Sequence, residues 1–195
     1  RRHTRYGTVT GVQTCALPIS FVRSCDLYET YVKRLAAEVF QRSRLAAAFA
    51  VPRTVDEAIA QGDLAPAVAR TPVAWLVAMV ERGGWVTREG DRHVLAEALP
   101  EGDAEAIRAQ QAQHDPRCLP SYDLAAYAAQ HYPAVLSGTV TGERVLGNPE
   151  ALELWTAYFS NANPLYAVTN IIGAMAATQA LGRAGGMVQI GRAHV

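Results

Sequence analysis

The first long stretch of this chain alternates between apolar and polar positions with the spacing of a helix. Large apolar side chains recur about every four positions between residues 27 and 50, and charged side chains fill the positions between them. This period is typical of an amphipathic helix with one buried face. We therefore predict a single helix over residues 27–50, and its buried face consists of Leu27, Tyr31, Leu35, Val39, Leu45 and Phe49.

A capping signal marks the start of a second, shorter helix. Pro52 ends the first helix, and Thr54 follows with Glu57 three residues later. This spacing allows the two side chains to cap each other's backbone amides, as in a capping box. We expect a helix that runs to about Gln61 and then turns at Gly62.

A third helix and a β-hairpin complete this half of the chain. The helix begins at Pro66 or Thr71, buries Val73, Leu76, Val77 and Val80, and ends at the glycine pair 83–84. Residues 85–87 and 93–95 favour strands on either side of a turn at 89–91. A short helix, a turn, a second helix and a hairpin are the elements of a winged helix-turn-helix.

The second half of the chain predicts helices with little else. The sequence pattern favours a polar helix over 103–114 and a second helix over 122–131, which Pro133 ends. A connector at 116–120 separates the two helices. The glycine-rich segment 136–147 predicts a short strand at most. The fold class is therefore mainly α: a winged helix-turn-helix followed by a helical segment, with one short β-hairpin.

Two Asn-Pro pairs mark the last two helices. Asn148-Pro149 and Asn163-Pro164 each place an N-cap residue before a proline at the first helical position. The first pair starts a helix on which Trp155 and Phe159 are expected to be core residues. The second starts a helix over about 165–181, and its expected core stripe is Val168, Ile172, Met175 and Ala176.

The two ends of the chain can be encoded by one DNA segment. Residues 15–19 can be encoded by TGTGCTCTTCCGATC, and the reverse complement of that string, shifted by one base and extended, encodes residues 190–195. The string resembles the standard adapter of short-read sequencing libraries. We therefore expect residues 1–20 and 189–195 to be adapter-derived tails with no native structure.

The insert between the tails is expected to be a fragment of a longer protein, with a helical and winged-helix region over 21–100 and a helical region over 101–188. The charge of this insert is negative. Without Arg1, Arg2, Arg5 and Arg192, it contains 14 basic and 18 acidic residues, a net charge of about −4. This balance disfavours nucleic acid and anionic membranes as partners. No apolar run approaches the roughly 20 residues that span a bilayer.

Few side chains in the insert suggest covalent or metal chemistry. Cys25 and Cys118 show no pairing pattern, which is typical of a reduced, cytoplasmic protein. The three histidines of the insert are scattered and lack the spacing of metal ligands. We therefore expect no metal site.

Tyr166 and Asn170 are the best candidates for binding residues. They lie four positions apart and so share one face of the last helix, where polar groups are unusual. A phenol and an amide there could hydrogen-bond an amino-acid-like group of a ligand. Alternatively, the two side chains could form hydrogen bonds with other groups of the protein core and bind no ligand. Asn161 and Asn163 are interpreted as a turn residue and a helix cap.

The stretch LWTAYFSNANPLYAVTN, at residues 154–170, resembles the region just before the Rossmann-like domain of class I S-adenosylmethionine-dependent methyltransferases. The closest similarity is to members of polyketide-synthase type and to those with a winged-helix N-terminal region. The resemblance implies that Tyr166 and Asn170 lie near the cofactor, S-adenosylmethionine. It also implies that the intact enzyme takes a small-molecule or carrier-bound substrate, and that the winged helix packs on protein or forms a homodimer.

This chain departs from that family in one important respect. The glycine loop after the first Rossmann strand, and the acidic residue that binds the ribose, would both follow residue 188. Gly182, Gly185 and Gly186 precede that strand and lack the G-x-G-x-x-G spacing. We therefore expect the fragment to be inactive and not to bind the cofactor. Two alternatives remain: a winged-helix transcription regulator and a helical protein-interaction module.

Overall fold

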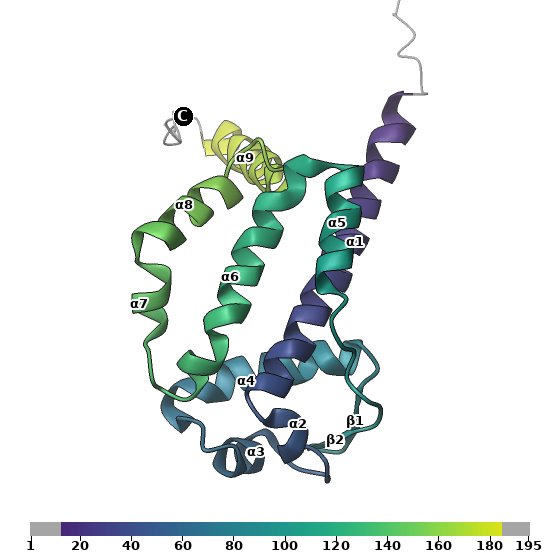
Figure 1. The fold of residues 1–195 in the computed structure, drawn as a ribbon. Helices are drawn as coiled ribbons and strands as arrows, with labels where there is room; N and C mark the ends of the chain where they lie inside the picture. The colour runs from purple at the N-terminus through teal and green to yellow at the C-terminus, as the bar shows by residue number, and fades with distance from the viewer. Residues whose placement is uncertain (1–12, 185–195) are drawn as a thin grey trace, which may run out of the picture.

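The computed structural model describes residues 13–184, and the side chains of residues 19–180. Over this range the chain is helical apart from one antiparallel hairpin (Figure 1), which confirms the mainly α prediction. In chain order, the elements are α1 Gln13–Arg42, α2 Leu45–Ala48, α3 Val55–Gln61, α4 Pro66–Arg82, β1 Val86–Glu89, β2 Arg92–Leu95, α5 Ala104–His114, the 3₁₀ turn η1 Pro116–Cys118, α6 Leu119–Leu136, α7 Gly142–Leu146, α8 Pro149–Tyr158 and α9 Pro164–Ala184.

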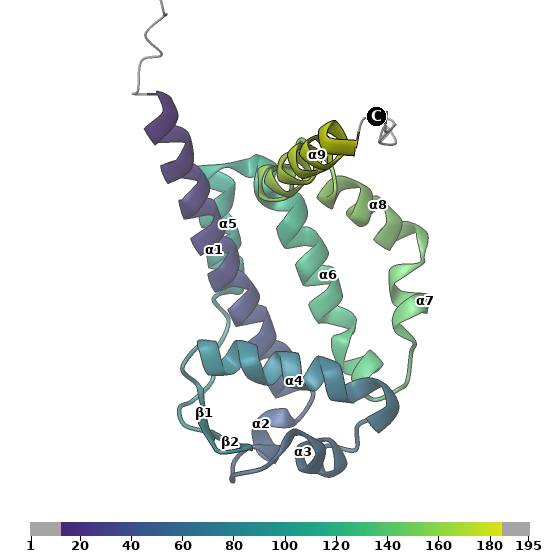
Figure 2. The ribbon, with the colours of Figure 1, turned by 180° about the vertical axis from the view of Figure 1, so that it is seen from behind.

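Helix α1 is the long element on which the other parts are assembled. Its C-terminal half packs with α2, α3, α4 and β1 around Phe40 and Phe49. Its middle turns, residues 27–35, pack against α5, η1 and α6 around Tyr31 and Tyr122. Figures 1 and 2 show α3 and the hairpin near one end of α1 and α9 toward the other.

The prediction of one helix over residues 27–50 was wrong at one point. The chain turns after Arg42, where Arg44 adopts a left-handed conformation with φ of 60°, and then forms the short α2. This turn brings Phe49 back onto α1, where its ring stacks on Phe40 with centroids 5.5 Å apart. The predicted apolar face is otherwise correct, because Tyr31, Val39 and Leu45 are buried as expected.

Helix α1 also begins earlier than expected. It starts at Gln13, so residues 13–20 are helical although we expected no native structure there. Adding residues to an existing helix avoids the cost of nucleation, and this favours such an extension. Ser20 also contacts α5, because its carbonyl oxygen lies 3.0 Å from Nε2 of His114. The remaining parts of the two tails, residues 1–12 and 189–195, lie outside the described residues.

The capping box of α3 is present as predicted. The Thr54 hydroxyl accepts a hydrogen bond from the Glu57 amide at 3.2 Å, and the Thr54 amide donates to the Glu57 carboxylate at 2.9 Å. Arg92 of β2 donates to both oxygens of the same carboxylate. The Glu57 carboxylate of the capping box therefore also links the hairpin to α3.

The hairpin follows α4 as predicted and pairs Val86 with Leu95. Its turn contains Gly90, which has a φ of +67° that L side chains rarely adopt. Arg53, in the segment between α2 and α3, adds an isolated bridge to His93, with N–O distances of 3.0 and 2.7 Å. All four residues predicted to form the buried face of α4 are buried.

Helix α6 continues through Pro133, where we expected it to end. A proline lacks the amide that would bond the carbonyl four residues earlier, here that of Ala129. The Arg42 guanidinium takes that place, donating to the carbonyl oxygens of Ala129 at 3.5 Å and Gln130 at 2.9 Å. Arg42 of α1 thus supplies a donor to the carbonyl that the proline leaves without one, and the helix runs on to Leu136.

The glycine-rich segment after α6 forms a helix instead of the predicted strand. Thr141 caps α7 by accepting a hydrogen bond from the Arg144 amide at 3.2 Å. Helix α8 then begins at Pro149 and is capped by Asn148, whose side chain accepts from the Ala151 amide as predicted and also donates to the Tyr127 hydroxyl at 2.6 Å. These contacts hold α7 and α8 along one side of α6 (Figure 1).

Candidate functional site

The corner between α8 and α9 is built from aromatic rings. Trp155 stacks on Phe159 with centroids 5.1 Å apart, and Tyr166 of α9 meets Phe159 edge-on at 4.8 Å. Tyr158 lies 5.1 Å from Tyr166 and completes the cluster. Burial, with a smaller contribution from Tyr166, raises the pKa of the Tyr158 hydroxyl. The cluster fixes the angle between the two helices and places the predicted site residue Tyr166 inside it.

The expectation that Phe159 is a core residue was wrong. Its side chain is 45% exposed, and Trp155 is half-buried. The rings of Trp155, Tyr158 and Tyr166 contact Phe159 but leave nearly half of its side chain exposed. The aromatic cluster is therefore a surface feature of this chain.

Asn170 makes its hydrogen bonds within this corner. Its side-chain amide donates to Oδ1 of Asn161 at 2.7 Å and to the carbonyl oxygen of Phe159 at 3.4 Å. Asn170 thus links the α8–α9 turn to the second turn of α9 by hydrogen bonds. Both predicted site residues are half-buried and lie on one helix, as the sequence indicated.

Asn163 precedes α9, but its side chain does not cap the helix as predicted. Its amide donates instead to Ser121 at 2.8 Å and to the carbonyl oxygen of Tyr158 at 2.9 Å. Its own Oδ1 is buried and has no hydrogen-bond partner among the described residues. The side chain therefore anchors the α8–α9 turn to α6, and this role has no signal in the local sequence.

The predicted core stripe of α9 is largely exposed. Ile172 and Met175 are 61% and 59% exposed, and the adjacent Ile171 is 58% exposed. The start of α9 is better covered, because Leu165 packs on the cluster around Tyr122. Beyond Asn170 the helix therefore presents an apolar face that no described residue covers, and we call Ile171, Ile172 and Met175 the α9 face.

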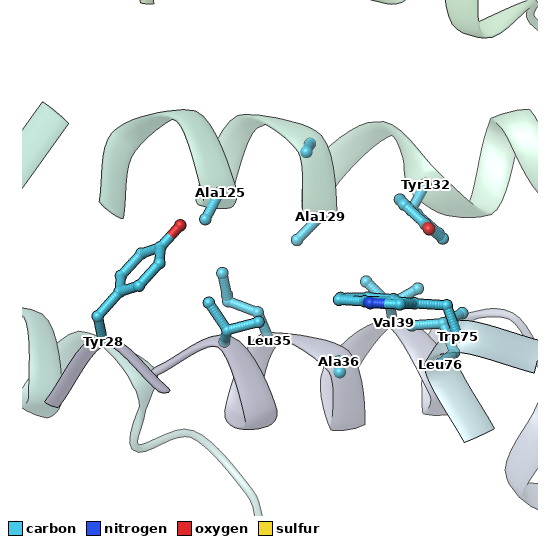
Figure 3. A pocket seen from close by; sticks show the side chains of 11 residues that line it. Tyr28, Leu35, Ala36, Val39, Trp75, Leu76, Ala125, Ala129 and Tyr132 are labelled. Carbon is cyan, nitrogen blue, oxygen red and sulfur yellow. The ribbon is translucent and has the colours of Figure 1, made fainter. Parts of the chain in front are cut away.

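A second candidate site lies between α1, α4 and α6. It is an apolar pocket of about 190 Å³ with Tyr28 at one end and Trp75 and Tyr132 at the other (Figure 3). Sequence analysis did not identify this pocket. The only signal was the alanine-rich run of α6, because small side chains on one helix leave space when the facing helix does not approach.

The tyrosines of this pocket are partly withdrawn from water. Burial is the main cause that raises the pKa of Tyr28 to about 12, and burial also raises the pKa of Tyr132. Both hydroxyls therefore remain protonated at neutral pH and can donate hydrogen bonds. The Trp75 ring lies 6.4 Å from the Tyr132 ring and is 45% exposed.

The described residues can be compared with the requirements of a metal site and of a membrane-spanning helix. They contain no group of three or more His, Cys, Asp or Glu side chains placed to hold a metal ion. Among the same residues, no helix combines the length and the apolar character that crossing a membrane requires. The two candidate sites are therefore the α8–α9 corner and the apolar pocket.

No family model matches this chain, and no curated protein is significantly similar to it in sequence. Among solved structures, the DszA carbon methyltransferase has a similar fold, with a TM-score of 0.67 and 17% sequence identity. The alignment covers 96% of this chain and 50% of that chain. The chain therefore spans about half the length of this methyltransferase and shares the fold of the part that it matches.

Proposed function

We propose that this chain is the N-terminal, accessory part of an S-adenosylmethionine-dependent methyltransferase, and that it is inactive alone. The observation that carries the proposal is the similarity of nearly the whole chain to half of a carbon methyltransferase. In the complete protein, this part would cover a small-molecule or carrier-bound substrate in the cytoplasm. The Rossmann-like domain that binds the cofactor would follow α9.

The first part of the chain is best interpreted as a winged helix. The short helix α3 packs against the longer α4, and the β1–β2 hairpin follows as the wing. The bridge between Arg53 and His93 supplies the position of a third, minimal strand. The winged-helix interpretation therefore accounts for the order of the elements and for the backbone pairing between them.

The α9 face supports a larger assembly. Three neighbouring large apolar side chains are more than half exposed on a helix that directly precedes the proposed missing domain. Covering such side chains would contribute about 1.5–3 kcal/mol for each one that becomes fully buried. We propose that the cofactor-binding domain covers this face in the complete protein, and that a homodimer is the alternative partner.

Tyr166 and Asn170 would then lie beside the cofactor. We expect the chain alone to produce no heat with S-adenosylmethionine in calorimetry, and the full-length protein to bind it. Replacing Asn170 with Ala in the full-length protein should weaken binding by a few-fold to about a hundredfold, because a hydrogen bond to the ligand is lost.

The matched control is Asn161→Ala, which removes the partner of Asn170 within the α8–α9 corner. If Asn170 contacts the cofactor, Asn161→Ala should leave the affinity nearly unchanged. Equal losses in both variants would mean that Asn170 only stabilises the corner. Cofactor binding by the chain alone would contradict the proposed division of the protein.

A transcription regulator is the competing function for a winged helix, but α4 is poorly suited to DNA. One side of α4 packs against α1 and α6 as well as α3. Arg70, near its N-terminus, is paired with Asp56 at 3.2 Å. A recognition helix instead presents basic side chains to phosphates and bases. The packing of α4 therefore favours a protein-facing role.

We expect no tight complex between this chain and duplex DNA in an electrophoretic shift assay at low salt. The control is the Asp56→Ala variant, which frees Arg70 and should bind DNA no better than weakly. A complex of the unmodified chain that weakens steeply as salt is added would instead support the regulator interpretation.

A further inference from the structure

The pocket between α1 and α6 is a preformed apolar space. Five residues of α1, including Val32 and Leu35, line it opposite the alanines of α6, and Leu76 of α4 closes one side. Figure 3 shows Ala125 and Ala129 directed from α6 toward Leu35, with open space between the two helices. Between its ends the α6 wall is lined by the methyl groups of Ala125, Ala128 and Ala129, and Tyr132 of the same helix lies at the end beside Trp75.

The size of the pocket matches a small ring. Its volume is about 190 Å³. An engineered apolar cavity of about 150 Å³ stays dry and binds benzene. One aromatic ring with a short substituent therefore fits this space, and a long chain or a fused polycycle would extend into solvent.

The polar atoms of the pocket restrict its ligand further. None of the residues that line it carries a formal charge, so an ionised ligand would lose its hydration without gaining an opposite charge. The polar side-chain groups of the pocket are the hydroxyls of Tyr28 and Tyr132 and the indole N–H of Trp75. The indole N–H can only donate, and the protonated tyrosine hydroxyls donate readily.

We propose that this pocket binds a neutral monocyclic aromatic molecule that carries a carbonyl oxygen. The ring would lie between Leu35 of α1 and the alanines of α6, and the carbonyl would accept a hydrogen bond from Tyr28 at one end or from the Trp75–Tyr132 pair at the other. The site is formed by α1, α4 and α6 alone, so it does not depend on the proposed methyl transfer or on the α8–α9 corner.

Acetophenone is a suitable probe, measured by ligand-observed NMR and calorimetry. We expect saturable binding with a dissociation constant of about 1 mM or tighter, typical of so small a ligand. Ethylbenzene has nearly the same shape without the acceptor and should bind about 2- to 10-fold more weakly. Benzoate, which is charged at neutral pH, should bind at least about tenfold more weakly than acetophenone.

Two variants locate the binding. Ala125→Leu adds a branched side chain to the α6 wall and should abolish binding, whereas Ala157→Leu, on the exposed side of α8, should not change it. Two further variants test the hydrogen-bond donor. Tyr28→Phe keeps the ring and removes the hydroxyl. It should weaken acetophenone binding by about 2- to 10-fold and leave ethylbenzene unchanged if Tyr28 is the donor. The same substitution at Tyr132 tests the other end of the pocket.

Absence of acetophenone binding to the unmodified chain, up to the solubility limit of the ligand, would overturn the proposal. Equal binding by the unmodified chain and Ala125→Leu, with both folded by circular dichroism, would also overturn it. If Ala125→Leu does not fold, the two Tyr→Phe variants decide, and an unchanged acetophenone affinity in both of them counts against the site. Self-association that Ala125→Leu removes, without ligand binding, would assign the pocket to a second copy instead.

Discussion

Replacing Phe40 with Ala should lower the free energy of unfolding by about 3–5 kcal/mol, the usual cost of removing a buried aromatic side chain. Phe40 has 0% exposure and stacks on Phe49 where α1, α2 and α4 meet. A cavity there would weaken the contact of α1 with α2 and α4. Urea denaturation followed by circular dichroism measures the loss.

Phe159→Ala is the matched control because it removes the same side chain from a position that is 45% exposed. Its cost should be smaller, about 1–2 kcal/mol, because nearly half of the side chain already contacts solvent and the loss is that of its ring contacts with Trp155, Tyr158 and Tyr166. Similar losses for the two variants would mean that the core around Phe40 is not packed as described.

Replacing Gln111 with Leu should cost about 2–4 kcal/mol, because two buried hydroxyls lose their partner. The Gln111 amide donates to Ser24 of α1 at 3.2 Å, and its carbonyl oxygen accepts from the Tyr122 hydroxyl of α6 at 3.3 Å. All three side chains are buried, and burial is the main cause that raises the pKa of Tyr122. Leu has a similar size, so the loss reports mainly on hydrogen bonding.

A double-mutant cycle separates this effect from packing. Tyr122→Phe removes the hydroxyl that Gln111→Leu leaves without an acceptor. The double variant should therefore be more stable than the sum of the single losses predicts, with a coupling of about 0.5–3 kcal/mol. Strict additivity in urea denaturation would show that the two groups do not interact.

Local signals in the sequence predicted the first half of the fold well. The Thr54–Glu57 capping box, the four buried residues of α4 and the turn at Gly90 depend on neighbours within a few positions. Such signals can be identified without knowing the tertiary structure. The helix starts at Pro149 and Pro164 were correct for the same reason.

Two of the incorrect predictions have a tertiary cause. Pro133 lies inside α6, and Arg42, more than eighty positions away in sequence, donates to the carbonyl that the proline leaves free. Asn163 turns away from its helix because Ser121 lies beneath it. Periodicity alone could not foresee either contact.

The candidate sites show a related limitation. The spacing of Ile172 and Met175 indicates an apolar face, but spacing does not say whether the same chain covers it. The alanines of α6 would allow a facing helix to pack closely against them, and they are equally compatible with an open pocket. For Tyr166 and Asn170, the sequence correctly predicted a shared helix face, and their proposed role beside a cofactor stays a prediction.

The most direct test of the central proposal is to sequence the source DNA beyond the codon of Val188. If this chain is the accessory part of a methyltransferase, the reading frame should continue into a β-strand, a glycine-rich loop and an acidic residue at the end of the next strand, as cofactor binding in a Rossmann-like domain requires. A frame that stops there, or that continues into a domain without that loop and acid, would contradict the proposal.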